Sequence, residues 1–211
     1  MGDMYIAGRE NWKISIDEPQ ILRIALYIRE IAGLQPRTDP VIPLLDPPPT
    51  AWPAWVRRPD EPPPQPLSEA ARIVATEQWT QWWYQALSGS SATLEDLTYP
   101  SFRSFAHQPE LRGLLIRHYP NAMLWSTAAA DDPRVKRDHL APGMRLTGLV
   151  QDLERAAGRT SRPFALRITV IAVQTKHAWV LDSGHLLITH HLIRDDENVL
   201  DWLRPQIKAL V

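Results

Sequence analysis

In this chain of 211 residues, the side chains best suited to catalysis or metal binding that also cluster in the sequence are histidines. Four of the seven histidines lie near the C-terminus, with Asp182 among them: His177, His185, His190 and His191. Imidazole is a frequent metal ligand, and it also exchanges protons near neutral pH. The cluster could therefore bind a metal ion or act as a general base, provided that the fold brings its members together.

The strands around these histidines decide which of them can meet. From Arg162 to Val211 the sequence is rich in β-branched residues with turn signals between them, which predicts a three-stranded antiparallel meander closed by a helix. A two-residue turn at Ser183-Gly184 would place His177 opposite His190, with their Cβ atoms about 5 Å apart. His190 and His191 would point to opposite faces of a strand, so both cannot join one site.

A metal site on this hairpin needs further ligands from elsewhere in the chain. His118, His139 or a carboxylate could supply the third ligand, which makes a metal-dependent hydrolase one alternative function. Histidines hydrogen-bonded within a sheet explain the same pattern without a metal. We therefore assign no metal ion and no cofactor from the sequence.

Several common catalytic devices are missing from the sequence. It contains no GxxxxGK[ST] loop, no GxGxxG, no HExxH and no GxSxG. Cysteine is absent, which excludes disulfides, thiolate nucleophiles and cysteine-ligated metals. The acidic runs 131–132 and 195–197 precede predicted helices, where helix capping accounts for them. These observations favour a non-enzymatic function, although they do not exclude an enzyme with a dispersed site.

The charge and hydropathy of the chain restrict its partners. The formal net charge is −1, which gives no bulk electrostatic case for nucleic acid or an anionic membrane. A nucleic-acid binder would need the central cations on one face, and acidic residues are interspersed among them. These cations are Arg103, Arg112, Arg117, Arg134, Lys136, Arg137 and Arg145. No run approaches the roughly 20 apolar residues of a membrane span, and no secretory signal is apparent, so we expect a cytoplasmic protein, and the composition suggests a bacterial source.

Helical periodicity dominates the first two-thirds of the chain. It predicts helices over 17–33, capped by Asp17 and ended by Gly33, over 68–87, over 146–157 and at the C-terminus. A helix beginning at Pro109 is expected to end at Pro120, with a second helix over 122–130. Alternation over 12–16 suggests a short edge strand, and Pro205 is expected to kink or split the last helix. The apolar face of the second helix contains Trp79, Trp82 and Trp83, which core packing explains better than an aromatic binding platform.

Residues 36–66 hold twelve of the twenty prolines and cannot form a helix interior or a central strand. Apolar residues interrupt the prolines, so a strap laid across the helices is more consistent with the sequence than a solvated linker. Trp52 and Trp55 are its expected anchors and the expected partner-binding residues. The spacing Pro40 to Pro43 also fits a ligand of a polyproline-binding groove.

We therefore expect an α+β fold and a single domain over 1–211, with a helical N-terminal two-thirds, a proline-rich strap over 36–66, and a C-terminal meander with a closing helix. The favoured function is a cytosolic interaction protein, an adaptor, accessory or inhibitor subunit of a bacterial assembly that binds another protein. Its support is the abundance of tryptophan, a residue type that anchors interfaces. A hydrolase using His177 and His190 and a nucleic-acid binder using the central arginines are the alternatives.

Overall fold

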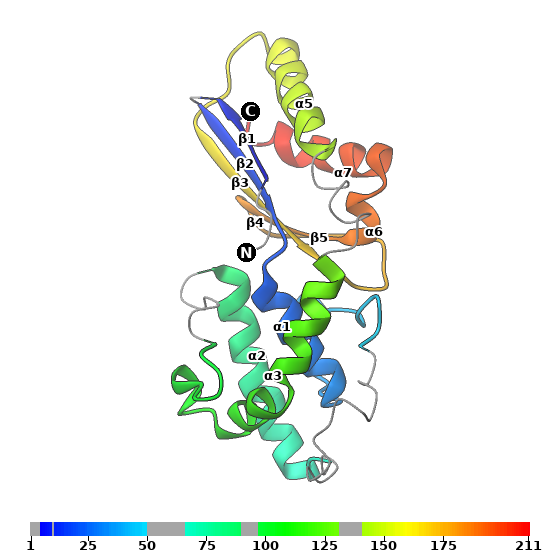
Figure 1. Ribbon diagram of the computed structural model, residues 1–211. Coiled ribbons are helices and arrows are strands. Elements are labelled where there is room, and N and C mark those ends of the chain that lie inside the picture. The colour runs from blue at the N-terminus through cyan, green and yellow to red at the C-terminus, as the bar shows by residue number, and fades with distance from the viewer. Residues whose placement is uncertain (1–4, 10, 50–65, 90–96, 131–140) are drawn as a thin grey trace. The chain divides into compact units, whose positions relative to one another are not determined.

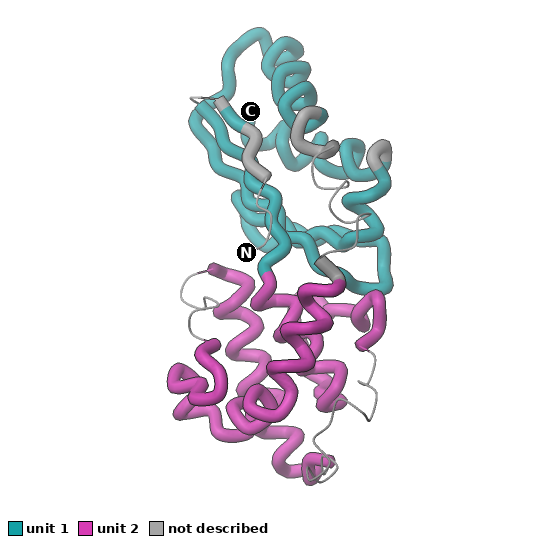
Figure 2. The backbone as a smooth tube through the Cα atoms, in the orientation of Figure 1, with its two compact units in different colours: residues 1–19, 129–211 teal, residues 20–128 magenta. Residues whose placement is uncertain are grey.

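The protein is described from a computed structural model over residues 5–9, 11–49, 66–89, 97–130 and 141–211. It has an α+β fold with a mixed sheet. The chain divides into two compact units, coloured separately in Figure 2, one formed by residues 1–19 and 129–211 and the other by residues 20–128. The expectation of a single domain stays a prediction, because this division does not test whether either unit folds alone.

The first unit contains a five-stranded sheet in the order β1-β2-β3-β5-β4 (Figure 1). Its strands are β1 (Tyr5–Arg9), β2 (Trp12–Asp17), β3 (Phe164–Ile171), β4 (Ala178–Asp182) and β5 (His185–Thr189). β2 pairs parallel with β3, and β3 pairs parallel with β5. The two outer pairs, β1 with β2 and β4 with β5, are antiparallel. The sheet is therefore built from both ends of the sequence.

One face of this sheet is covered by the helices α5 (Ala141–Ala157), α6 (His190–Ile193) and α7 (Asp196–Lys208) (Figure 1). The apolar residues at alternate positions of β2, β3 and β5 enter this core, as period-2 alternation requires. They include Ile14, Ile168 and Ile188, which lie side by side with Leu149 and Leu203 of the helices in one buried cluster. The partly exposed opposite face carries polar residues of the same strands, among them Asp17 and Arg167.

Two expectations about the sheet are wrong. The C-terminal strands do not form an antiparallel meander, because β3 and β5 are parallel and β4 lies outside them at the edge. Residues 12–17 form no edge strand but lie between β1 and β3, so the N-terminal part of the chain is not only helical. Parallel pairing joins segments that are far apart in sequence, so the local periodicity of either segment cannot predict it.

The second unit consists of α1 (Gln20–Ile31), α2 (Glu69–Ser88), the short 3-10 helix η3 (Arg103–Phe105) and α3 (Pro109–Ala130). The predicted cap Asp17 is instead the last residue of β2, but Gly33 ends α1 as expected. Its φ is +61°, and Leu34 N–H donates to the Arg29 carbonyl at 2.9 Å. Such left-handed closure of a helix suits glycine, which has no Cβ. Ser68 caps α2 by accepting from Ala71 N–H.

Tryptophan fills the core of the second unit, as the spacing on α2 predicts. Trp79, Trp82 and Trp83 are almost completely buried. Trp79 stacks on Trp83 with ring centroids 5.4 Å apart, and its Nε1–H donates to the Ala25 carbonyl of α1 at 2.6 Å. These indoles therefore join α2 to α1 and are not available as a binding platform.

Two prolines lie inside helices that continue past them. α3 runs through Pro120, so the expected helix end there is wrong, and α7 runs through Pro205 without being split. Pro120 is exposed, so water can hydrate the carbonyl that its missing N–H would have bonded. Leu111, Leu115 and Trp125 lie buried on either side of it, and their packing outweighs the lost bond.

No helix in the described ranges is long and apolar enough to cross a membrane.

Replacing Trp79 by alanine tests the indole core. We expect a loss of about 3–5 kcal/mol in the free energy of unfolding, because the change leaves a large cavity and removes the donor to Ala25. The matched control is Gln81→Ala, an exposed position on the same helix, which we expect to stay within about 0.5 kcal/mol of wild type. Urea unfolding measures both, and equal losses in the two variants would contradict this account of the core.

Candidate functional site

The hairpin histidines do not form the site that the sequence suggested. Asp182 pairs with His185 across the Ser183-Gly184 turn, but an irregularity between Val180 and Asp182 shifts the rest of the register by one residue. His177 consequently meets Thr189, which donates its N–H to the His177 carbonyl at 3.0 Å. His190 has already left the strand as the first residue of α6. The predicted His177–His190 pair is therefore wrong, and the hydrolase alternative loses its geometric basis.

His185 and His190 have separate polar neighbours within the first unit. His185 is buried, and its Nε2 lies 2.8 Å from Thr169 Oγ1 on β3. Burial, helped by nearby Arg167 and opposed by Asp182, lowers the pKa of His185. His190 Nε2 lies 3.0 Å from Glu18 Oε2, with both side chains buried. Because each histidine is engaged inside the fold, a structural role accounts for both.

Two carboxylates adjoin the Thr169–His185 pair: Asp17, which hydrogen-bonds with Thr169, and Asp182, which pairs with His185 across β4 and β5. Burial raises the pKa of Asp17, while Arg167, 3.6 Å away, and a hydrogen bond with Thr169 oppose the rise. Thr169 is completely buried, whereas Asp17 and Arg167 in the same group are partly exposed. Among the described residues, no group of three histidine, aspartate or glutamate side chains could hold a metal ion.

The other residues singled out from the sequence divide between described and undescribed segments. Trp52 and Trp55 lie outside the described residues, as do His139 and three of the central cations, Arg134, Lys136 and Arg137. Arg112 donates twice to the Ser101 carbonyl, at 3.0 and 2.9 Å, and so supports the chain before α3. Whether the central cations share a face therefore stays a prediction.

The first part of the proline-rich strap is held against α1 by a buried arginine. Arg29 donates to the Ile42 carbonyl at 2.8 Å and to the Pro43 carbonyl at 2.5 Å, and it also contacts Glu30 at 2.5 Å. Ile42 and Leu45 are buried, whereas the residues before each of them, Val41 and Leu44, are 75% and 56% exposed. The strap over 36–49 thus has a docked side and an outward apolar side.

A second attachment ties the strap to α2. The Tyr84 hydroxyl accepts from Asp39 N–H at 2.8 Å and lies 3.4 Å from the carbonyl of the same residue. The segment between Gly33 and Asp39 is therefore fixed at both ends, by the end of α1 and by Tyr84. A chain held in this way can serve as one wall of a binding groove.

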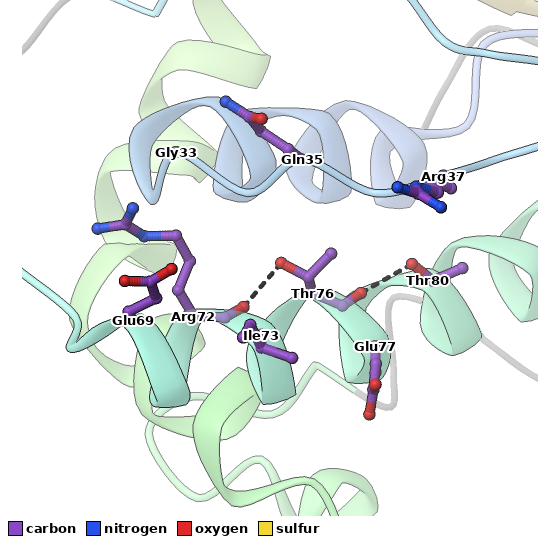
Figure 3. A pocket seen from close by; sticks show the side chains of 9 residues that line it. All are labelled: Gly33, Gln35, Arg37, Glu69, Arg72, Ile73, Thr76, Glu77 and Thr80. Atoms are coloured by element: carbon purple, nitrogen blue, oxygen red, sulfur yellow. Dashed lines mark hydrogen bonds between the residues drawn. The ribbon is translucent and has the colours of Figure 1, made fainter.

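A groove of about 770 Å³ lies between this segment and α2 (Figure 3). Gly33, Gln35 and Arg37 form one wall. The α2 wall is formed by Glu69, Arg72, Ile73, Thr76, Glu77 and Thr80. These α2 residues recur at helical spacing on the side that adjoins the tryptophan stripe, with Thr76 and Thr80 three residues before Trp79 and Trp83. We refer to this feature as the strap groove.

The strap groove gathers polar groups whose bonding capacity is unused. In the described part of the chain, Gln35, Arg37, Glu69 and Glu77 make no hydrogen bond or ion pair. Thr76 and Thr80 donate their hydroxyl protons to α2 carbonyls, both at 2.7 Å, as the dashed lines in Figure 3 show. Their oxygens can still accept. Ile73, 57% exposed, adds an apolar surface among them. In Figure 3 Arg72 and Thr76 point toward the strap wall, whereas Gln35 and Glu77 point away from the opposite wall.

Sequence reasoning missed this groove. The run Glu69, Ile73 and Glu77 was visible as a second stripe on the helix, beside the tryptophan face. A polar stripe normally indicates a solvated face, so it gave no signal by itself. The opposite wall comes from the strap, whose path depends on Arg29 and Tyr84, and no local pattern encodes those contacts.

Comparison of the chain with protein-family models, with curated proteins and with solved structures found no match.

Histidine burial predicts acid sensitivity. Burial, with a smaller contribution from Arg117, lowers the pKa of His118 on α3 to about 4. Below its ordinary value of about 6.5 the unfolded chain binds a proton that the folded chain does not, so the free energy of unfolding should fall from pH 6.5 to 4. The lowered pKa of His185 also makes the free energy of unfolding fall as the pH falls. The raised pKa of Asp17 opposes that fall at the acidic end of the range.

The variant His118→Asn should show a shallower fall in the free energy of unfolding between pH 6.5 and 4 than wild type. Thr127→Ala, an exposed change on the same helix, should keep the wild-type slope. Urea unfolding at four pH values gives the slopes. Equal slopes for His118→Asn and wild type would show that this histidine does not couple folding to pH.

Proposed function

We propose that the chain is a protein-interaction module and that its strap groove receives an extended segment of a partner protein. The observation that supports this most directly is the groove itself, in which a concavity beside the anchored strap is lined by Ile73 and by four polar side chains that have no partner among the described residues. Exposed apolar surface edged by polar residues is typical of interaction sites.

The exposed side of the strap extends the proposed interface. Val41 and Leu44 present apolar side chains outward, although their neighbours Ile42 and Leu45 are buried. Trp52 and Trp55, further along the same segment, stay our proposed anchors for the partner, because tryptophan is enriched where interfaces gain most of their binding energy. The role that fits is non-enzymatic: an adaptor, accessory or inhibitor subunit in the bacterial cytoplasm.

Photo-cross-linking from the groove tests this proposal. A benzophenone amino acid at Ile73 should give one discrete adduct with a partner in cells of the source organism. The same probe at Leu124, an exposed apolar position on α3 of the same unit, should not. Mass spectrometry identifies the adduct and the cross-linked segment. Identical adduct patterns from the two positions would contradict a partner site at the strap groove.

Substitutions then test which residues carry the binding. We expect Ile73→Asp to reduce copurification of the cross-linked partner by about tenfold or more, since burying a carboxylate in an apolar contact is unfavourable. Trp52→Ala and Trp55→Ala should each reduce it, whereas Leu124→Asp should not. Normal copurification with all three variants would refute the assignment.

A further inference from the structure

The exposure of side chains along the strap repeats every three residues. Val41 and Leu44 are 75% and 56% exposed, whereas Ile42 and Leu45, which follow them, are 7% and 0% exposed. Residues 40, 43 and 46 are half-buried, so the order exposed, buried, half-buried occurs twice in succession from Val41 onward. A β-strand would instead alternate at every second residue.

A repeat of three residues is typical of the polyproline II helix. This left-handed helix has three residues per turn, rises about 3.1 Å per residue and forms no internal hydrogen bonds. Pro40 and Pro43 favour it, because proline fixes φ at about −65° and restricts the residue before it to extended conformations. Residues 40–46 thus have the composition and the side-chain periodicity of one such helix, which has three distinct edges.

One of the three edges is taken up by the protein's own fold. The edge that carries Ile42 and Leu45 is buried, and Arg29 donates to two carbonyls of the same stretch. The second edge, with Val41 and Leu44, points to solvent, and the third edge is half-buried. The strap is therefore held from one side and presents an apolar edge on another.

The anchored strap is preorganised for recognition. Ordering a flexible segment on binding costs conformational entropy, and a conformation that is already formed avoids that cost. Val41 and Leu44 carry no charge and lie about 9 Å apart, which is one turn of the helix. Exposed aliphatic side chains at this spacing suit a groove lined by aromatic rings, which is the usual means of recognising a polyproline helix.

We propose that the partner of this module binds the strap as a polyproline II ligand and seats Val41 and Leu44 against aromatic side chains that line a groove on its own surface. This rests on the proposed function, because it names the kind of surface that the partner brings. The contact is assigned to the exposed edge with Val41 and Leu44, whereas the sequence alone suggested the spacing from Pro40 to Pro43, which are half-buried.

Photo-cross-linking from the exposed edge tests the chemistry of the partner surface. A benzophenone amino acid at Leu44 of the full-length chain should give an adduct with the same partner that the probe at Ile73 captures. Mass spectrometry should map this adduct to a partner segment that contains more than one tryptophan, tyrosine or phenylalanine. The matched control is the same probe at Val180, an apolar residue of the first unit that is 52% exposed, which should give no such adduct.

Substitutions separate recognition of a polyproline helix from other modes of binding. We expect Val41→Asp and Leu44→Asp each to reduce copurification of the cross-linked partner by about tenfold or more, because a carboxylate is costly to bury against aromatic rings. Val41→Pro should stay within about threefold of wild type, since a polyproline helix accepts proline at every position. A partner that added a β-strand beside the strap would need the Val41 N–H and would be lost in this variant. Val180→Asp should have no effect on copurification, and urea unfolding should show wild-type stability for the strap variants, because both strap positions are exposed.

The outcomes separate this inference from the function on which it rests. A discrete adduct from Ile73 without one from Leu44 would leave the groove as a partner site and overturn recognition of the strap as a polyproline helix. The same holds if the Leu44 adduct maps to a segment without aromatic residues or to a second copy of this chain, or if Val41→Pro loses the partner as Val41→Asp does. If neither position gives an adduct, both proposals are wrong.

Discussion

The buried Arg29 guanidinium is the interaction on which the second unit's surface depends. A proline-rich segment cannot form a ladder of its own, since proline has no N–H to donate. Arg29 replaces that missing network by donating to two successive strap carbonyls, and Glu30 balances its charge within the same contact. Burial lowers the pKa of Arg29 and Glu30 opposes the shift, so the carboxylate helps keep the guanidinium charged. This side chain fixes the strap at residues 42 and 43, while the groove wall over 33–39 is held by the end of α1 and by Tyr84.

The two units use polar residues in different ways. In the first unit some buried polar side chains contact one another, as in the Thr169–His185 contact and the Glu18–His190 contact, whereas Trp12 Nε1 and Asp17 Oδ1 are buried without a hydrogen bond in the described part of the chain. Buried polar groups satisfied in this manner specify a fold and leave little capacity for a ligand. In the second unit Glu69, Glu77 and Arg37 are exposed around a groove and bond to nothing in the described residues. We therefore propose the strap and α2 as the recognition surface, although the histidines are the more conspicuous residues in the sequence.

Local features were predictable where a short stretch of chain determines them. The indole stripe of α2, the glycines that end α1 and α5, and Asp195 as the cap of α7 all follow from spacing and residue type. The strand pairing was not predictable in this way, because β2 meets β3 across roughly 150 residues of chain and the irregularity near Leu181 shifts the hairpin register. The helix end predicted at Pro120 was wrong because Pro120 is exposed on α3, and a helix tolerates a proline at an exposed position. The groove could not be foreseen, since one wall was visible as a helix stripe while the other depends on the contacts of Arg29 and Tyr84.

Amide hydrogen exchange over residues 34–45, compared between wild type and Arg29→Met, tests the central claim most directly. Methionine keeps much of the apolar stem and removes the donors to Ile42 and Pro43. The account predicts that the hydrogen-bonded amides of Leu34 and Asp39 exchange more slowly in wild type than in the variant, while the core amides of α2 around Trp79 and Trp82 stay protected. Unchanged protection of residues 34–45 in Arg29→Met would contradict it, because the strap would then be held in place without the interaction that is argued here to form the groove.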